Sequence, residues 1–308
     1  MKVVIAGGTG FLGQPLARAL AADGREVVVL TRDGAGNSGK SDGKNLIRFV
    51  RWNSADERGA WTAEVEGAAV VNLAGEPIGA RRWSPAQKQR ILESRIQATR
   101  SLARAVRGAG RPAVAFISGS AVGYYGPLHD EVVREDHLAG SDFLARVCEQ
   151  WESEAVQGVG DATRVVLIRT GLALEKDGGA LSRMLTPFKL GLGGPLGSGR
   201  QYWPWIHRAD WIALVRWAID TPSATGAINA TAPHPVTNAE FTRALGRALH
   251  RPAFLPAPAF ALRIALGEMA DALLLSGQNA VPAKADRLGF AFRYSNLDAA
   301  LGAIFPPT

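Results

Sequence analysis

Cysteine and long apolar runs are nearly absent from this chain. Its 308 residues include a single cysteine, Cys148, which excludes an internal disulfide framework and suits a reducing compartment, so we expect the cytoplasm. No apolar run approaches the roughly 20 residues that span a bilayer, so no membrane partner is expected. Lys2 leads straight into an apolar strand, which is not the layout of a signal peptide.

Clustered charge is missing as well. The formal net charge is +7, but lysine and arginine are spread along the chain without a long basic block. This balance would attract an anionic cofactor, whereas nucleic-acid binding would need a clustered basic face, so no nucleic-acid partner is expected. His129, His137, His234 and His250 show no metal-ligand spacing, and with one cysteine we expect no metal site.

The most informative segment present is a glycine cluster near the N-terminus. The apolar residues 3–6 enter it and an amphipathic helix leaves it, which is the layout of a dinucleotide-binding βαβ unit. In such a unit, glycines permit a tight turn, and backbone N–H groups at the helix N-terminus bind a pyrophosphate. The cofactor-binding residues predicted here are Gly7, Thr9, Gly10, Phe11, Leu12 and Gly13. The alternative is a glycine-rich turn that binds no cofactor.

The end of the second predicted strand, 26–31, bears on the choice of cofactor. An NAD site usually places an acid here to bind the ribose 2′-OH, but this strand ends in Thr31 and Arg32. A permanently cationic guanidinium suits a 2′-phosphate, so NADP(H) is preferred and NAD(H) stays possible. Asp33 could instead bind the ribose, and Arg32 could be a solvated residue at a strand end.

Strands and helices alternate along the first half of the chain. This pattern predicts an α/β fold with a Rossmann-type, doubly wound parallel sheet. Residues 33–45, rich in Gly, Ser and Lys, read as a mobile surface loop. The further strands are expected at 46–52, 68–73, 113–117 and 163–168, and the main helices at 83–107 and 143–155.

A different pattern begins near residue 171 and predicts a smaller, mainly helical C-terminal lobe. It holds a glycine-rich loop at 191–200, an apolar helix at 260–275 and a small helix near 297–301. The predicted division is an NADP-binding core at 1–170, to which 205–235 returns, and a substrate-side lobe at 171–308. The lobe includes a small C-terminal domain at about 250–300.

Several short motifs occur in one order along the whole chain. They are Gly75-Glu76-Pro77-Ile78, Ser94-Arg95-Ile96 with Thr99, Ser120-Ala121-Val122-Gly123-Tyr124-Tyr125-Gly126, Trp205-Ile206-His207 and Pro233-His234-Pro235-Val236-Thr237-Asn238. With them the chain resembles the extended short-chain dehydrogenase/reductase superfamily. More narrowly, it is similar to the bacterial and organellar "epimerase family", whose atypical members carry a C-terminal domain of unassigned function. The resemblance implies a Rossmann fold, NADP(H) binding and a poorly defined reaction.

Further cofactor contacts are expected after the fourth and fifth strands. Leu73, Ala74 and Gly75 would line the adenosine and ribose side, and Ser118 would lie near the nicotinamide. Arg95 is expected to contact the cofactor or, with Arg81 and Arg82, an anionic substrate. Alternatively, these arginines are solvated.

The catalytic dyad of the superfamily is missing. The usual Tyr and the Lys four residues later stand at the start of the helix after the fifth strand, where the Lys lowers the pKa of the Tyr. Here that helix places Phe143 or Leu144 at the tyrosine position and Val147 or Cys148 at the lysine position. An ordinary keto-reductase or sugar-epimerase mechanism therefore does not carry over.

Other polar residues are candidates to replace the dyad. Ser118 and Ser120 could bind a substrate oxygen, and Tyr124 or Tyr125 could donate a proton if Arg200 or His207 lowered its pKa. On the substrate side we expect Glu76, Arg200, Trp205 and His207. Some of these residues have a structural alternative: the tyrosines could be packing residues, Glu76 could bind backbone N–H groups, and His207 could organise its loop.

Two functions remain open. The first is an oxidoreductase or epimerase-like enzyme that uses NADP(H) on a small carbonyl or sugar-like substrate, without the usual dyad. The second is a non-catalytic NADP(H)-binding sensor or regulator, in which the nucleotide orders the glycine-rich loop and exposes a surface for a partner. The oligomeric state is left as monomer or homodimer.

Overall fold

The computed structural model describes residues 1–32, 46–56 and 58–306 and contains one large parallel sheet. Its seven strands lie in the order β11-β7-β5-β4-β1-β2-β3. They are β1 (Lys2–Ala6), β2 (Glu26–Thr31), β3 (Ile47–Arg51), β4 (Ala69–Asn72), β5 (Ala115–Ala121), β7 (Val165–Thr170) and β11 (Gly226–Ala230). All the neighbours are parallel, and the order reverses between β1 and β4, so the predicted doubly wound Rossmann-type sheet is confirmed.

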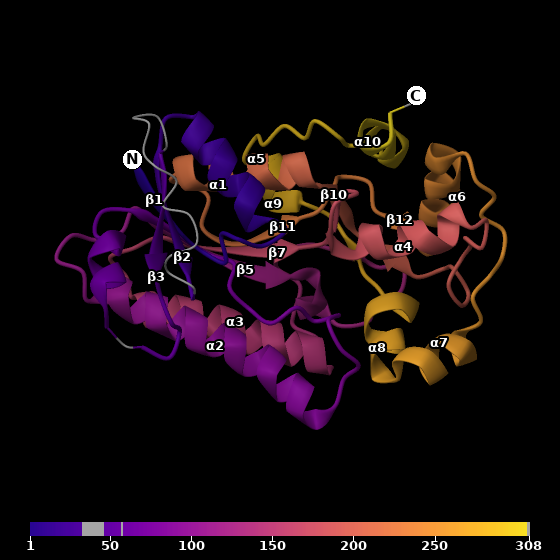
Figure 1. Ribbon diagram of the computed structural model, residues 1–308, viewed down its shortest axis with the longest axis horizontal. Helices are drawn as coiled ribbons and strands as arrows, with labels where there is room; N and C mark the ends of the chain where they lie inside the picture. The colour runs from indigo at the N-terminus through magenta and orange to yellow at the C-terminus, as the bar shows by residue number, and fades with distance from the viewer. Residues whose placement is uncertain (33–45, 57, 307–308) are drawn as a thin grey trace.

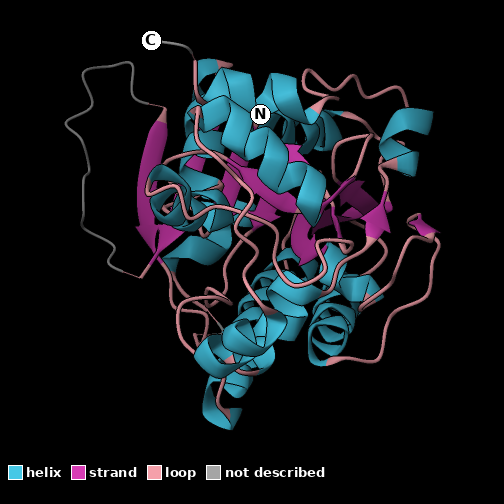
Figure 2. Ribbon diagram, turned by 90° about the vertical axis from the view of Figure 1, so that its right-hand side faces the viewer, coloured by secondary structure: helices cyan, strands magenta, loops and turns pink. Residues whose placement is uncertain are grey.

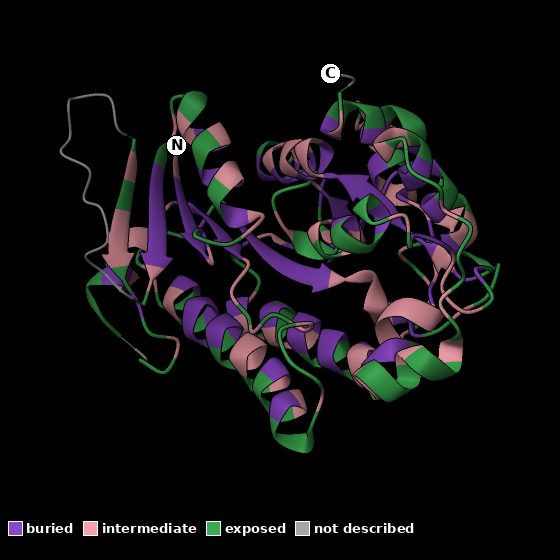
Figure 3. Ribbon diagram, turned by 45° about the vertical axis from the view of Figure 1, so that its right-hand side comes forward, coloured by how far each residue is buried: buried purple, intermediate pink, exposed green. Residues whose placement is uncertain are grey.

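Helices cover both faces of this sheet (Figures 1 and 2). Helices α1 (Gly13–Ala22) and α5 (Arg208–Asp220) lie on one face, and α2 (Pro85–Arg107) and α3 (Phe143–Val159) lie on the other. Successive side chains of a strand point to opposite faces of the sheet and so contribute to two cores. Val3 and Ile5 of β1 join the core under α1 and α5, and Val4 joins the core under α2 and α3. Figure 3 shows the inner strands of the sheet as buried, whereas the edge strand β3 is intermediate to exposed.

Local sequence explains where the longest helix begins. The Ser84 side chain accepts a hydrogen bond from the Gln87 N–H at 3.2 Å, and Pro85 occupies the first turn, as the Ser-Pro pair predicts. Strand β5 differs from its prediction, because it runs on beyond residue 117 to Ala121. Ser118, Gly119 and Ser120 are weak strand formers, but pairing with β7 extends the strand.

The second lobe has a core of its own. Its helices α4 (Gly179–Lys189), α6 (Asn238–Leu249) and α10 (Leu297–Ile304) pack around Trp203, Trp205 and Phe241. Short strand pairs join the lobe together: β8 (Leu172–Leu174) with β10 (Trp205–His207), and β9 (Tyr202–Trp203) with β12 (Val236–Thr237). A further pair, β6 (Val132–Val133) with β13 (Asn279–Ala280), connects the segment after β5 to the C-terminal region. The remaining short helix, α9 (Ala283–Arg287), packs against β11.

The prediction of a single apolar helix at 260–275 is wrong. The segment forms α7 (Ala259–Leu266), α8 (Glu268–Ala270) and a π-helical turn at Asp271–Leu275. Gly267 breaks it with φ +63°, a left-handed conformation that favours glycine. No residue of α7 is buried, and its Phe260 and Ile264 are exposed (Figure 3). The small helix near 297–301 is confirmed as α10.

Two earlier expectations fall on residues that the structure does not describe: the surface loop at 33–45 and Asp33 as a ribose ligand. Among the described residues, no helix is long and apolar enough to cross a membrane.

Candidate functional site

The turn between β1 and α1 needs glycine at two positions. Gly7 has φ +78°, and a Cβ there would lie 2.7 Å from the Leu73 carbonyl group in the loop after β4. A Cβ on Gly13 would overlap the carbonyl oxygen of Gly7. Glycine therefore lets the turn approach the next loop and lets α1 pack closely on the turn.

The α1 N-terminus fits a pyrophosphate. No side chain caps it, and its first turn contains no acidic residue that would repel an anion. Thr9 and Gly10, just before the helix, are exposed at the carboxyl edge of the sheet. Uncapped N–H groups, a favourable helix dipole and glycine at the point of closest approach are the features that bind a dinucleotide phosphate.

Phe11 connects this turn to the second lobe. Its ring packs so closely on the backbone of Gly178 and Gly179, at the start of α4, that a Cβ on Gly179 would lie 2.9 Å from the ring. The Arg208 guanidinium lies 5.1 Å from the centre of the same ring, and Arg208 also forms a bidentate ion pair with Asp177. The start of α4 is therefore held against the predicted phosphate site.

At the other end of the predicted cofactor site, two exposed arginines follow or end neighbouring strands of the sheet. Arg32 is exposed directly after Thr31, the last residue of β2. Thr31 is the register partner of Arg51, the exposed last residue of β3. The sequence analysis missed Arg51. The available signal was that the strand after 26–31 also ends in a cationic residue. This signal points to the 2′-phosphate site only when the register of the two strands is known.

The loop after β4 is held rigidly by buried hydrogen bonds. Asn72 is fully buried; its Nδ2 donates to Thr99 Oγ1 at 2.9 Å, and its Oδ1 accepts from the Ala74 N–H at 3.2 Å. The Glu76 N–H donates to Ser94 Oγ at 2.9 Å. The Glu76 carboxylate accepts a long 3.4 Å bond from the buried Gln87 side chain, and no backbone N–H of the described residues donates to it, unlike in the structural alternative.

Arg95 lies beneath this loop. Its Nη1 donates to the carbonyl oxygens of Glu76, at 3.0 Å, and of Ile91, at 2.9 Å, and its guanidinium lies 5.1 Å from the Trp151 ring of α3. Burial lowers the pKa of Arg95, while the nearby Cys148 and Glu76 oppose that shift. The side chain retains partial access to solvent. In contrast, Arg81 and Arg82 are exposed, as the solvated alternative predicts.

A buried polar network uses up several of the predicted catalytic groups. Ser120 Oγ donates to Glu152 at 2.6 Å, and Arg169 binds both oxygens of the same carboxylate at 2.8 Å through Nε and Nη2. Hydrogen bonding to Glu152 raises the pKa of Arg169 although burial opposes it. Ser120 is buried, and its hydroxyl already donates a hydrogen bond to Glu152, so it is not available to donate to a substrate oxygen.

Tyr125 belongs to the same network. Its hydroxyl donates to Asn229 at 2.7 Å and accepts from Arg169 Nη1 at 3.0 Å, and the side chain is buried. Burial raises the pKa of Tyr125 to about 12. Arg169 and Asn229 lower this pKa, but burial outweighs them, and neither Arg200 nor His207 is among the groups that act on it. The Tyr125 hydroxyl is used within the network.

Tyr124 and Ser118 are the remaining members of the predicted catalytic set. The Tyr124 ring is half-buried, with the Arg169 guanidinium 3.5 Å from its centre, and its hydroxyl has no partner among the described residues. Ser118 is fully buried, and its Oγ donates to the Gly119 carbonyl at 3.1 Å. Tyr124 thus stays open to a proton-donor role, whereas Ser118 would have to exchange its present bond.

Aromatic packing occupies the place of the missing dyad. The Phe143 ring meets Trp83 edge-on at 5.1 Å, and Lys88 Nζ lies 4.6 Å from its centre. Lys88 also forms an ion pair with Glu268 of α8 at 2.7 Å. At the predicted lysine position, Cys148 is buried, and burial raises the pKa of its thiol to about 12, so it is not a thiolate nucleophile.

The predicted substrate-side residues of the second lobe do not converge on one site. Trp205 is fully buried in the core of the lobe and donates to the His234 carbonyl at 3.1 Å, so its assignment as a substrate contact is wrong. Arg200 is exposed. His207 is buried against Tyr294, and its Nδ1 accepts from the Ala209 N–H at 3.0 Å, which caps α5.

The glycine-rich loop of this lobe is also packed. Gly193 accepts from the Leu255 N–H at 3.1 Å, and Gly197 donates to the Ala257 carbonyl at 2.9 Å. A Cβ on Gly194 would overlap the backbone of Leu255. The loop is therefore tied to the segment before α7 and does not resemble a free lid.

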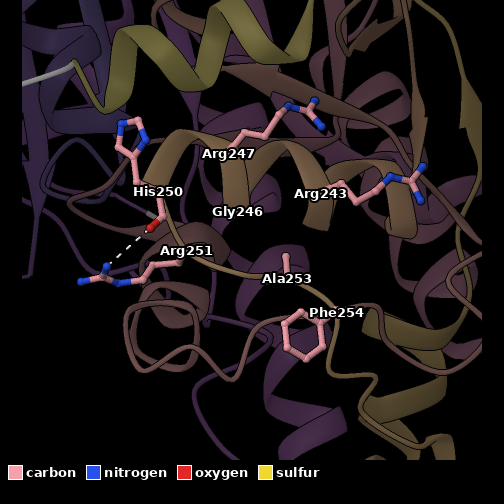
Figure 4. Close-up of a pocket in the computed structure, with 7 residues that line it drawn as sticks. All are labelled: Arg243, Gly246, Arg247, His250, Arg251, Ala253 and Phe254. Atoms are coloured by element: carbon pink, nitrogen blue, oxygen red, sulfur yellow. Dashed lines mark hydrogen bonds between the residues drawn. The ribbon is translucent and has the colours of Figure 1, made fainter.

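A hollow lies elsewhere, at the C-terminal end of α6 (Figure 4). It is open, with a volume of about 740 Å³, and is lined by Arg243, Arg247, His250, Arg251 and Phe254 among others. None of the predicted site residues lies in it. Within the described part of the chain, no group of three or more His, Cys, Asp or Glu residues could hold a metal ion.

Comparison with known proteins places the chain in a family. The model of the NAD dependent epimerase/dehydratase family matches residues 3–230, and a domain of unknown function, DUF1731, matches residues 257–304. An epimerase family protein of Mycobacterium leprae is 43% identical, with 97% of this chain and 94% of the relative covered. The chloroplastic SDR39U1 homolog of Arabidopsis thaliana is 42% identical, with 99% of this chain and 86% of the relative covered.

A solved structure agrees with these matches. The crystal structure of the human epimerase family protein SDR39U1 (isoform 2) with NADPH is 36% identical, covers 99% of both chains and has a TM-score of 0.88. The cytoplasmic location expected from the sequence stays a prediction. By its sequence and by its fold, the chain belongs to the NAD dependent epimerase/dehydratase family.

Proposed function

We propose that this chain binds NADP(H) at the carboxyl edge of its sheet and uses it as an oxidoreductase or epimerase-like enzyme. The observation that carries the proposal is the β1–α1 turn, where glycine at 7 and 13 permits close packing and the helix N-terminus is uncapped. The human relative, crystallised with NADPH, supports the choice of cofactor.

The residues divide along the cofactor as follows. The turn 7–13 binds the pyrophosphate through backbone N–H groups, and Arg32 binds the 2′-phosphate beside Thr31. Arg51, which lies in register with Thr31, is the second cation at that end. Leu73, Ala74 and Gly75 line the ribose side, held in place by Asn72, and Ser118 lies at the nicotinamide end.

The substrate is a small carbonyl or sugar-like compound. When bound, NADPH supplies a hydride to a carbonyl carbon, and the carbonyl oxygen then needs a proton. Tyr124 is the residue proposed to supply it, because its hydroxyl has no partner among the described residues whereas that of Tyr125 does.

A non-catalytic sensor is the second candidate. It is favoured by the packing of Trp83 and Lys88 around Phe143, which fills the place of the missing dyad. In this case, bound NADP(H) would change how the chain meets a partner, without turnover.

Calorimetric titration with NADPH, NADP⁺, NADH and NAD⁺ tests the cofactor assignment. We expect micromolar binding of NADPH, and Arg32→Ala should weaken it by about tenfold or more while leaving NADH nearly unchanged. Arg51→Ala should act in the same direction. Arg243→Ala, which removes an exposed arginine of α6, is the charge-matched control and should have no effect. Equal losses for NADPH and NADH would contradict the 2′-phosphate assignment.

Turnover then separates the enzyme from the sensor. The NADPH complex is mixed with a panel of small aldehydes, ketones and keto sugars, and nicotinamide absorbance is followed. Steady oxidation that Tyr124→Phe slows supports the enzyme. Normal NADPH binding without turnover on any of the panel supports the sensor.

A further inference from the structure

Two partly or fully buried arginines near the carboxyl edge of the sheet differ in how their donors are used. In Arg169, Nε and Nη2 form a side-on fork that holds both oxygens of Glu152, each at 2.8 Å. Its Nη1 donates to Tyr125 at 3.0 Å and to the Glu135 carbonyl at 3.1 Å, and its plane lies on the Tyr124 ring. All three nitrogens of this guanidinium are used within the protein.

Arg95 is held in a similar way but lacks a carboxylate. Its Nη1 also donates to two carbonyl oxygens, and its plane lies near an aromatic ring, that of Trp151. Within the described residues, neither Nε nor Nη2 reaches an acceptor and no ion pair forms with Arg95. The same side-on fork that binds Glu152 in Arg169 is therefore unused in Arg95, although its Nη1 is fixed in place.

The surroundings of Arg95 suit a ligand rather than a missing internal bond. The loop of Gly75 and Glu76 passes over the guanidinium, and a Cβ on Gly75 would lie 3.2 Å from its central carbon, so glycine avoids a close side-chain contact with the group. Arg95 keeps partial access to solvent. A buried cation without a counter-ion is costly, and a bound anion would relieve that cost.

We propose that Arg95 binds a carboxylate of the substrate through its Nε–Nη2 fork, at the edge of the sheet between β4 and α3. The inference rests on the proposed function, because it names the class of substrate: a carbonyl or sugar-like compound that carries a carboxylate. The planar fork matches two carboxylate oxygens, as it does in the pair of Arg169 with Glu152.

The neighbouring charges favour a monoanion. Glu76 is close enough to act electrostatically on Arg95, and a doubly charged phosphate would be repelled by it more than a carboxylate. Cys148, the other titratable neighbour, is a neutral thiol, since burial raises its pKa to about 12.

Side-chain Nε–H signals of arginine in a nitrogen–proton NMR spectrum report on the fork directly. Acetate is the probe, and acetamide is its uncharged control. Addition of acetate should shift one Nε–H signal that is missing from the spectrum of Arg95→Lys. The Nε–H of Arg169, assigned with Arg169→Lys, should stay in place because Glu152 already holds it. Acetamide should shift neither.

Affinity gives the second measurement. Calorimetry should show acetate binding weakened by about tenfold or more in Arg95→Gln, and unchanged in the exposed-residue control Arg82→Gln. Both experiments are run with and without NADPH. Acetate binding at the Arg95 Nε–Nη2 fork can then be measured even if the chain does not bind NADPH.

Three outcomes would overturn the proposal. Acetate could shift the exposed arginine signals as much as that of Arg95, which would mean general ion binding. Acetate could bind wild type and Arg95→Gln equally. NADPH alone could shift the Arg95 signal and prevent acetate from binding, which would make Arg95 a cofactor residue. Failure of NADPH to bind at all would instead contradict the proposed function.

Discussion

The two sides of the sheet edge use polar residues in opposite ways. At the carboxyl ends of β1, β2 and β3, no side chain caps the α1 N-terminus, and Arg32 and Arg51 are exposed. On the β5–β7–β11 side, Ser120, Glu152, Arg169, Tyr125 and Asn229 bind each other in the core. Polar groups at the same edge are thus exposed in one place and bonded to each other in the other, and this difference in internal hydrogen bonding underlies the proposal that the first place binds the ligand.

The largest effect is expected from a substitution that breaks the internal network of Glu152 and Arg169. Glu152→Gln leaves the buried Arg169 without its carboxylate and should lower the free energy of unfolding by about 3–5 kcal/mol. Urea denaturation measures it. The control is Glu154→Gln on the same helix, which removes the more exposed pair with Arg100 and should cost less than about 1 kcal/mol. Similar losses in both variants would contradict the structural role of the network.

The second prediction tests the proposed NADPH site at the glycine turn between β1 and α1. Gly13→Ala forces a methyl group against the Gly7 carbonyl and should cost about 2–3 kcal/mol, with loss of NADPH binding by calorimetry. Gly302→Ala in α10 meets no atom within 4 Å and should leave NADPH binding intact and raise stability by up to about 1 kcal/mol. A Gly13→Ala variant with normal stability and NADPH affinity would refute the close packing of α1 on the turn.

A pair of tyrosine variants sharpens the comparison within the network. Tyr125→Phe removes a hydroxyl that serves both Asn229 and Arg169 and should cost about 1–2 kcal/mol in thermal or urea unfolding. Tyr124→Phe removes a hydroxyl without a described protein partner and should change stability by less than about 0.5 kcal/mol. The opposite ranking would mean that Tyr124, not Tyr125, is the structural residue.

The smallest effect concerns His207 and pH. Burial lowers the pKa of His207 below the ordinary value of 6.5, so the unfolded chain binds this proton more readily than the folded chain. The contribution of His207 to stability is therefore complete above pH 6.5 and is lost as the pH falls toward the folded pKa. His207→Asn keeps a side-chain acceptor for the α5 cap and removes the titration.

Unfolding free energies of both proteins at several pH values test this. The wild type should lose more stability than His207→Asn as the pH falls below 6.5, by less than about 1 kcal/mol. Parallel pH profiles would show that the His207 proton has the same affinity in the folded and unfolded chains.

Much of the fold could be predicted from sequence because its signals are local. The apolar strand and glycines of residues 2–13 and the Ser84–Pro85 helix start involve neighbours within a few residues. The break at Gly267 was missed, since an apolar run alone does not distinguish one helix from two short ones.

The roles of site residues were less predictable. Ser120 and Glu152 are 32 residues apart, and Tyr125 and Asn229 are 104 apart, so no local pattern shows that they are bonded. Trp205 is predicted to lie on the substrate side, yet the lobe core buries it completely. The significance of Arg51 depends on its register with Thr31, which chain spacing does not reveal.

The sequence by itself determined the parallel sheet, the glycine turn and the absence of a Tyr–Lys dyad, because strand periodicity, glycine conformation and residue identity are properties of short segments. Only the tertiary structure decided which polar groups are already satisfied. A hydrogen bond consumes a donor whatever the distance along the chain, so the availability of Tyr124 and of the Arg95 fork, and the unavailability of Tyr125 and Ser120, follow from packing alone.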